Sequence, residues 1–370
     1  MSISTIPQQA IETLSDAESR LATLPSVVGF DGFVDTILHV VEKRMSVSEY
    51  TRMTAMETFG SRITAAAGFS ANFEFVTQML KLGGNGPIMA NALLNAGLPL
   101  TYIGCLGKPA VHPVFDDFTK KAKVISIAEP GYTDAIEFED GKLMCGKHDS
   151  LKQVNWKNLK AHLPLENMVK EFENARLLAL VNWTMLPAMG EIFKNILEKI
   201  APQLTGEKRW VFFDLADPAK RTPEDIATAL GQISSFEQYF RVILGLNFQE
   251  SVQIGEVLGL PVPEQSHHAV ADHAAAIREK LGIHTLVIHP TRFAAAADAS
   301  GSFAIEGPYT EKPKITTGAG DHFNAGFCVG RLLGGDLPVS LQIGVATSGF
   351  YVREVHSPSA ADLRGFLKTL

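Results

Sequence analysis

The stretch TTGAGDHFNAGF, residues 316–327, places the carboxylate of Asp321 directly after three small residues, Gly318, Ala319 and Gly320. Apolar residues then follow at helical spacing, which predicts a loop that leads into a helix. Exposed amides at a helix N-terminus form an anion site, so a phosphoryl group could be held there beside Asp321. The alternative is a tight turn in which Asp321 only caps the helix or stands in its first turn.

The composition indicates a globular protein that acts on small molecules. The 370 residues are 46% hydrophobic, which is enough for a large core, and the formal charge of −7 comes without any cluster of Lys and Arg that would predict a nucleic-acid partner. The three cysteines have no CxxC spacing, which argues against a disulfide framework and a structural zinc site. No apolar run is long enough to span a membrane, and the N-terminus has neither a basic start nor an apolar core, so we expect a cytoplasmic protein without membrane association.

Short apolar runs alternate with helix-like patterns along the chain. The runs lie at residues 26–30, 100–105, 176–182, 210–215, 241–247 and 285–289, and helical spacing occurs at residues 191–200, 223–230, 249–258 and 269–281. Runs of this kind fit strands that are buried on both faces, so the alternation predicts an α/β fold with a mostly parallel sheet flanked by helices. Ligands bind such sheets beyond the carboxyl ends of the strands. Residues 301–314 contain many turn-forming residues and predict a loop.

Two stretches interrupt the alternation. Residues 36–82 hold a helix-like segment at 48–66, and residues 109–150 predict a hairpin around Asp140 and Gly141. Both could form a small lid over the sheet edge, within a single domain that covers residues 1–370; the alternative is two ordinary surface excursions. If the lid hairpin exposes apolar residues, we expect a homodimer through the lid.

Polar residues follow the first apolar run and precede the first helix with many small residues. In GFDGFVD, Asp31 and Asp35 could accept hydrogen bonds from sugar hydroxyls, because a carboxylate offers two acceptor oxygens and no competing donor. Asp31 beside a glycine fits a simple turn equally well. In LGGNG, Gly84 and its neighbours allow a close backbone approach, and Asn85 is the only side chain there that can both donate and accept.

Asn247 and Glu250 stand three residues apart after another apolar run. They could hold the water shell of Mg²⁺ near phosphates. The alternative is a capping box, in which each side chain bonds the backbone of the other. Asp214 ends a further run and is a secondary candidate for the same crevice. His289 and His322 are interpreted as packed or exposed bystanders.

Several catalytic motifs are absent: the chain has no GxxxxGK[ST], no GxSxG, no HExxH and no complete dinucleotide fingerprint. Phosphoryl transfer without a P-loop remains. Three motifs, in this order, resemble those of the ribokinase/PfkB family of carbohydrate kinases. LGGNGPIMANALLNAGLPLTYIGCLG is similar to its N-terminal Gly-Gly signature, LNFQES to its N-x-x-E motif and TTGAGDHFNAGF to its C-terminal signature.

The resemblance implies a ribokinase-like, doubly wound sheet with a small β-rich lid, and an enzyme that uses ATP and Mg²⁺ to phosphorylate a hydroxyl of a sugar or sugar-like alcohol. It also implies roles for particular residues. These are Asp321 as general base with Gly318, Ala319 and Gly320 as anion hole; Asp35, Gly84 and Asn85, together with Asp31, at the sugar; Thr316, Thr317, Asn247 and Asn324 at the nucleotide; and Glu250 with Asn247 at the metal.

The chain departs from the family at three places near these motifs, one of which is Lys108, where an Asp often follows the Gly107 turn. Ile315 stands where many members carry an Asp linked to a monovalent-cation site, which puts activation by K⁺ in doubt, and His289-Pro290 replaces a glycine-containing turn near the nucleotide. Two other interpretations stay open: a nucleoside kinase of the same fold, and a sugar- or nucleotide-binding regulator without turnover. For the kinase, the helix dipole predicts that Asp321 stays ionised at neutral pH.

Overall fold

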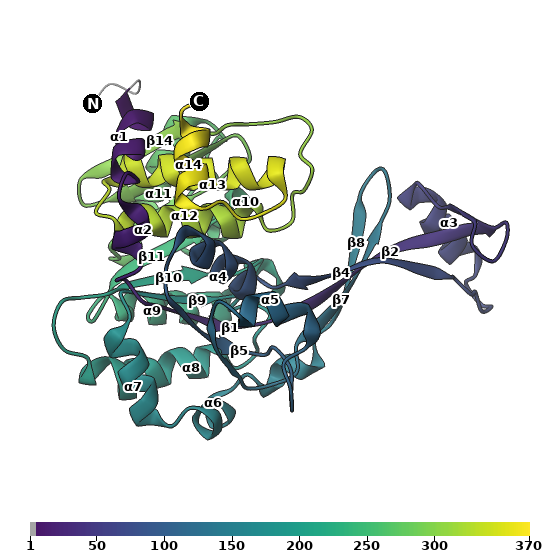
Figure 1. Ribbon diagram of the computed structural model, residues 1–370, viewed down its shortest axis with the longest axis horizontal. Helices are drawn as coiled ribbons and strands as arrows, with labels where there is room; N and C mark the ends of the chain where they lie inside the picture. The colour runs from purple at the N-terminus through teal and green to yellow at the C-terminus, as the bar shows by residue number, and fades with distance from the viewer. Residues whose placement is uncertain (1–4) are drawn as a thin grey trace.

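A nine-stranded sheet runs through the larger part of the molecule (Figure 1). The structure is a computed structural model and describes residues 5–370, so residues 1–4 of the predicted domain lie outside the described part. The strand order is β14-β13-β12-β11-β10-β9-β1-β5-β6. The bounds are β1 (Ser26–Phe30), β5 (Leu100–Gly104), β6 (Lys123–Ser126), β9 (Leu177–Val181), β10 (Trp210–Asp214), β11 (Arg241–Leu246), β12 (Thr285–Ile288), β13 (Phe293–Asp298) and β14 (Gly301–Glu306).

The six predicted strands are confirmed, each to within one residue at either end. They pair in parallel from β5 through β12, so their carboxyl ends meet at one edge. The prediction of a loop at residues 301–314 is wrong for β14, which pairs antiparallel with β13 at the end of the sheet. Four alanines dominate β13, and alanine gives little strand signal; the pairing with β12 and β14 makes this segment a strand.

Helices cover both faces of this sheet, as expected for an α/β fold. Val27 and Val28 of β1 belong to two different apolar clusters, one on each face. One face packs against α6 (Trp156–His162), α7 (Leu165–Asn174), α8 (Met189–Asn195), α9 (Pro223–Phe236), α10 (Phe248–Val257) and α11 (His267–Leu281). The other packs against α1 (Ile6–Thr13), α2 (Ala17–Leu21), α4 (Asn85–Ala96), α5 (Asp116–Thr119), α12 (Ala319–Leu332), α13 (Leu337–Glu354) and α14 (Ala360–Leu367). None of the helices within residues 5–370 combines the length and apolar character needed to cross a membrane.

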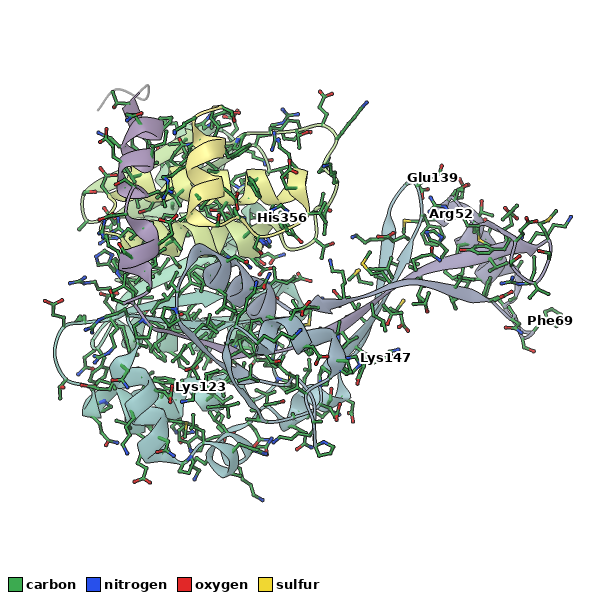
Figure 2. All side chains as sticks on the ribbon, in the orientation of Figure 1. Arg52, Phe69, Lys123, Glu139, Lys147 and His356 are labelled. Carbon is green, nitrogen blue, oxygen red and sulfur yellow. The ribbon has the colours of Figure 1, made fainter. Side chains whose placement is uncertain are left out.

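A second, five-stranded sheet projects from the body as an arm (Figure 1). It is built from β2 (Phe33–Arg44), β3 (Tyr50–Arg52), β4 (Phe75–Gly83), β7 (Gly131–Glu137) and β8 (Lys142–Lys147), with α3 (Met56–Ala65) packed on it. The hairpin predicted around Asp140 and Gly141 is confirmed by the β7–β8 pair. The helix predicted over 48–66 is wrong at Tyr50–Arg52, because these residues pair with β2 as β3. Phe69 lies at the far end of the arm (Figure 2).

The two faces of the arm differ in character. Alternate residues of a strand point to opposite faces, so Leu38 and Val40 of β2 lie on the face that α3 covers. The other face carries Asp35 with its cross-strand neighbours, and next to it an apolar row. That row runs across four strands as Met79, Ile37, Ala135 and Met144.

Candidate active site

Asp321 lies in the first turn of α12, so the predicted passage from loop to helix is confirmed. Gly318 is the N-cap residue with a φ of 90°, a left-handed conformation that favours glycine. The amide of Ala319 donates to the carbonyl of Thr316 over 3.1 Å and closes a turn. Of the three small residues, Gly318 and Gly320 therefore remain as the better candidates for donating an amide to a ligand.

The Asp321 carboxyl is buried, with 9% of the residue exposed, and Oδ1 accepts a hydrogen bond from Asn85 Nδ2 at 2.9 Å. Burial raises the pKa of Asp321 to about 8; the Asn85 hydrogen bond opposes this shift, and the nearby carboxylates of Asp31 and Glu250 add to it. The expectation that the helix dipole keeps Asp321 ionised at neutral pH is therefore wrong, because loss of hydration raises its pKa more than the dipole lowers it.

Asp31 is completely buried beneath the GGNG turn. Its Oδ1 accepts from the amide of Gly86 at 2.9 Å, and its Oδ2 accepts from Asn182 Nδ2 at 2.7 Å. Burial raises the pKa of Asp31 to about 6 against these hydrogen bonds. A Cβ on Gly84, whose φ is 95°, would lie 2.9 Å from Asp31 Oδ2. The carboxylate thus holds the glycine turn in place, which is close to the turn role that the sequence left open.

Asp35 lies two residues into β2, where the arm leaves the body. Its cross-strand partners are Lys81 of β4 and Thr133 of β7. Burial raises the pKa of Asp35, while the charges of Lys81 and Lys142 and a hydrogen bond from Thr133 oppose the shift. Burial and Lys142 also lower the pKa of Lys81, and the charge of Asp35 partly offsets that effect. The charges of both lysines therefore act on the Asp35 carboxylate at the base of the arm.

Lys142 connects the arm to the signature loop. Its Nζ donates to Thr317 Oγ1 over 2.8 Å, although Lys142 begins β8 at the tip of the hairpin. Lys147 at the other end of the same strand instead pairs with Asp134 of β7 at 2.8 Å. The open face of the arm is therefore turned toward the N-terminus of α12.

Asn247 and Glu250 form the capping box that was the alternative reading. Asn247 Oδ1 accepts from the amide of Glu250 at 2.9 Å, and Glu250 Oε2 accepts from the amide of Asn247 at 2.8 Å. Glu250 Oε1 accepts from the amide of Asp217. Both carboxylate oxygens thus already have backbone donors, and burial raises the pKa of Glu250.

Asp214 lies beside this box at the end of β10. Burial raises its pKa well above the ordinary value, and the charges of Glu250 and Asp321 raise it further. Asn324 Nδ2 donates to Asp214 Oδ2 at 3.0 Å, whereas Asn324 Oδ1 is buried without a hydrogen-bond partner in the described structure. Within residues 5–370, no three His, Cys, Asp or Glu side chains are close enough to hold one metal ion directly.

A cleft of about 600 Å³ opens on the other side of the α12 N-terminus. Its lining includes Asn247, His289, Pro290, Thr316, Gly320 and Phe323. The His289 ring lies 4.9 Å from that of Phe323, and a Cβ on Gly320 would come within 3.1 Å of His289. Burial lowers the pKa of His289 to about 4, so this ring is neutral at physiological pH. The sequence predicts His289 to be a bystander, whereas the structure places its ring in the wall of the cleft.

The predicted site residues thus fall into three neighbouring groups, with Asp321 between them. Asp31, Asp35, Gly84 and Asn85 lie at the base of the arm; Thr316, Asn247 and Gly320 line the cleft; and Asp214, Glu250 and Asn324 form a buried polar group. Sequence reasoning missed Asn182, which ends a predicted strand with a φ of 61° and could have been found by that position alone. It also missed Lys81 and Lys142, which only the cross-strand register of the arm brings to the site.

The chain matches the family model of prokaryotic ketohexokinase over residues 10–370. It belongs to that family. A ketohexokinase of Haloferax volcanii is 28% identical over 365 residues, which cover 96% of this chain and 95% of that protein. Membership of this family makes the chain a carbohydrate kinase of the ribokinase/PfkB type. The chain is therefore a sugar kinase.

Solved structures agree with this fold. Phosphofructokinase-2 from Escherichia coli, in complex with substrates and products, superposes with a TM-score of 0.64 at 14% identity, covering 94% of this chain and 99% of that one. Ribokinase from Arabidopsis thaliana, complexed with ribose and ATP, gives a TM-score of 0.62 at 15% identity with the same coverage of both chains. The ribokinase-like fold predicted from the motifs is therefore confirmed.

Proposed function

We propose that this chain transfers the γ-phosphoryl group of ATP to a primary hydroxyl of a ketohexose. The observation that carries the proposal is the position of Asp321, which is bonded to Asn85 at the base of the arm and adjoins, through Gly320, the cleft on the other side. A base in this place can reach a hydroxyl held on one side and a phosphoryl group held on the other. The ketohexose is taken from the name of the Haloferax volcanii relative.

Asp321 removes the proton of the attacking hydroxyl as the new oxygen–phosphorus bond forms. The bond between the γ-phosphorus and the bridging oxygen breaks, and ADP leaves. A pKa of about 8 suits this role, because a general base works best when its pKa lies near the operating pH. The amides of Gly318 and Gly320 then stabilise the charge on the transferring group, as anion-hole donors do.

The polar group beside Asp321 fits Mg²⁺ held through water. The charges of Glu250 and Asp321 raise the pKa of Asp214, and the charge of Glu250 also raises the pKa of Asp321, so a cation here would relieve repulsion between carboxylates. Asn324 Oδ1 is a buried acceptor without a hydrogen-bond partner in the described structure. Glu250, a member of this group, and Asn247, its partner in the capping box, would hold the water shell of the ion. The ion would neutralise the β and γ oxygens of ATP when bound.

The base of the arm fits the sugar. Asp35, Gly84 and Asn85 lie where the arm leaves the body, and Asn85 is hydrogen-bonded to Asp321. We propose that the segments 36–82 and 109–150 act as a lid on a single kinase domain. Lys142 supports this role because it already joins the hairpin to Thr317. Closure of the lid excludes water that would otherwise take the phosphoryl group.

The arm also supports a homodimer. Eight of the twelve large apolar side chains exposed within residues 5–370 belong to the arm, among them Met79 and Met144, which are 55% and 50% exposed. We propose that a second copy covers the apolar row to which these methionines belong. The three cysteines are free thiols, which suits a reducing cytoplasm.

The test is coupled release of ADP from the purified chain with ATP and Mg²⁺. D-Fructose and D-tagatose are offered beside D-ribose, D-glucose and adenosine, and each is also tested with Asp321→Asn. We expect turnover with a ketohexose, and a loss of roughly 10²–10⁴-fold in the variant. Preference for adenosine would establish the nucleoside-kinase alternative, and binding of sugar and ATP without any turnover would establish the silent regulator.

A further inference from the structure

Two stacked rings lie behind the signature loop and hold two consecutive carbonyl groups. Tyr351 of α13 donates from Oη to the carbonyl of Thr317 at 3.0 Å. His322 of α12 bonds through Nδ1 to the carbonyl of Gly318 at 2.7 Å. The rings are stacked, with centroids 3.6 Å apart and an angle of 13° between their planes. Both residues are buried, so this contact is an internal feature of the site.

Peptide geometry links these carbonyls to the anion hole. In a trans peptide the C=O of one residue and the N–H of the next point in opposite directions. The bond from Tyr351 to the Thr317 carbonyl therefore directs the Gly318 N–H away from Tyr351. Val352 of α13 lines the cleft, and Tyr351 lies about 100° round the helix from it. Tyr351 is not among the residues that line the cleft, so the amide that it orients points away from a ring that lies outside the cleft.

The hydrogen bonds of His322 form a chain with a defined direction. A carbonyl can only accept, so the network assigns the ring proton to Nδ1. Nε2 then accepts from Ser357 Oγ at 2.8 Å, and Ser357 Oγ in turn accepts from Asn91 Nδ2 at 3.1 Å. Burial lowers the pKa of His322 to about 4, so the ring is neutral and keeps an accepting nitrogen. Asn91 belongs to α4, the helix that starts at the GGNG turn, so the chain connects both signature motifs.

We infer that Tyr351 and His322 are positioning residues that hold the Thr317–Gly318 turn so that the Gly318 amide is aimed in advance at the transferring phosphoryl group. The inference rests on the proposed function. The turn needs such support, because Gly318 has a φ of 90° and two glycines give the loop great conformational freedom. A Cβ on Gly318 would lie 3.3 Å from Tyr351 Oη, so the hydroxyl also packs against the α-carbon of this residue. Donors fixed before the reaction stabilise developing charge without reorganisation.

The first experiment uses Tyr351→Phe, which keeps the ring and its stacking and removes only the hydroxyl. We expect kcat to fall about tenfold, because a misaimed anion-hole donor loses part of its effect. The KM for the ketohexose should change by less than about twofold, because the sugar is bound on the other side of Asp321. Tyr239→Phe, before the amino end of β11, is the matched control and should keep the wild-type kcat.

The second experiment separates the histidine's hydrogen bond from its packing. His322→Phe keeps an aromatic ring on Tyr351 but loses both hydrogen bonds, whereas His322→Asn offers an Nδ2 donor near the position of Nδ1. We expect a lower kcat in His322→Phe and a partial recovery in His322→Asn. Binding is measured in parallel: affinity for ADP with Mg²⁺ should be unchanged in Tyr351→Phe, and the gain in affinity on adding aluminium fluoride, a mimic of the transferring group, should be smaller.

Failure of this inference can be told from failure of the proposed function. If Asp321→Asn abolishes ketohexose phosphorylation while Tyr351→Phe keeps the wild-type kcat and aluminium fluoride response, the positioning role is refuted and the kinase assignment stands. If Asp321→Asn retains normal turnover, the proposed mechanism itself fails. Equal losses of melting temperature and kcat in Tyr351→Phe and Tyr239→Phe would show a purely structural contribution and would also overturn the inference.

Discussion

Asn85 donates a hydrogen bond to Asp321 over 2.9 Å, although the two residues are 236 positions apart. Each lies in the first turn of a helix, Asn85 in α4 and Asp321 in α12. The bond therefore joins the two signature motifs at the proposed reaction centre. It favours the ionised form of Asp321 and so opposes the burial that raises its pKa.

Removal of the Asn85 amide should move the pH profile to higher pH. Asp321 works as a base only when ionised, so kcat/KM of the wild-type enzyme should rise with pH through about 8. Asn85→Leu removes the hydrogen bond that lowers the pKa of Asp321, so the rise in kcat/KM should occur at higher pH. Asn95→Leu, on the same helix, should leave the profile in place. A profile for Asn85→Leu that is unmoved or shifted to lower pH would contradict this role of the amide.

Asp321→Asn should stabilise the protein at alkaline pH. The folded pKa of about 8 lies above the ordinary Asp value of 3.8, so the folded state holds the proton more tightly. The contribution of Asp321 to the free energy of unfolding therefore falls as the pH rises from about 4 to about 8. Melting temperatures at pH 5 and pH 9 should show a gain for Asp321→Asn that is larger at pH 9. Asp336→Asn at the exposed N-cap of α13 is the control, and an equal gain at both pH values would refute burial as the cause.

Lys142→Gln should weaken catalysis more than Lys147→Gln. Both lysines belong to β8, but Lys142 donates to Thr317, directly before the proposed anion hole, whereas Lys147 pairs with Asp134 within the arm. We expect kcat/KM to fall about tenfold in Lys142→Gln, because closure of the lid loses its contact with the loop. Lys147→Gln should remain close to wild type, since exposed ion pairs contribute little. Similar kinetics for the two variants would remove Lys142 from the closing contact.

Charge placed on the apolar row should separate the proposed dimer. Met79→Asp combined with Met144→Asp puts two carboxylates on the open face of the arm without changing the cluster beneath α3. Light scattering at micromolar concentration should give a dimer for the wild type and a monomer for the double variant. Val262→Asp, an exposed apolar position outside the arm, is the control. A wild-type monomer would disprove the dimer.

Much of the body could be predicted because its signals are local. Strands that are buried on both faces appear as continuous apolar runs, and the polar residues that end them, such as Asp31 and Asp214, gather at one edge for topological reasons. The β13–β14 hairpin escaped prediction because its alanines have no strand signal of their own and depend on pairing with β12. The strand at Tyr50–Arg52 escaped prediction because it has only three residues and is recognised by its pairing with β2.

The chemistry of the site depended on distances that no pattern contains. The sign of the pKa shift of Asp321 follows from its burial and from the charges of the distant residues Asp31 and Glu250, not from its place in a helix. The ambiguity of Asn247 and Glu250 could not be resolved from their spacing, since a capping box and a metal network use the same two residues. Lys142 entered the site only through the pairing of β7 with β8 and the direction of the arm.

Strand β2 gives the arm a mechanical property. Its twelve residues run without interruption from Phe33, near Asp31, to Arg44 in the outer part of the arm, a length of about 40 Å. Asp35 lies at the inner end of this strand, where a swing of the arm produces the smallest displacement. If the arm swings as the proposed lid, it acts as a lever whose pivot lies at the proposed sugar site: its outer end would travel far while the carboxylate of Asp35 would hardly move.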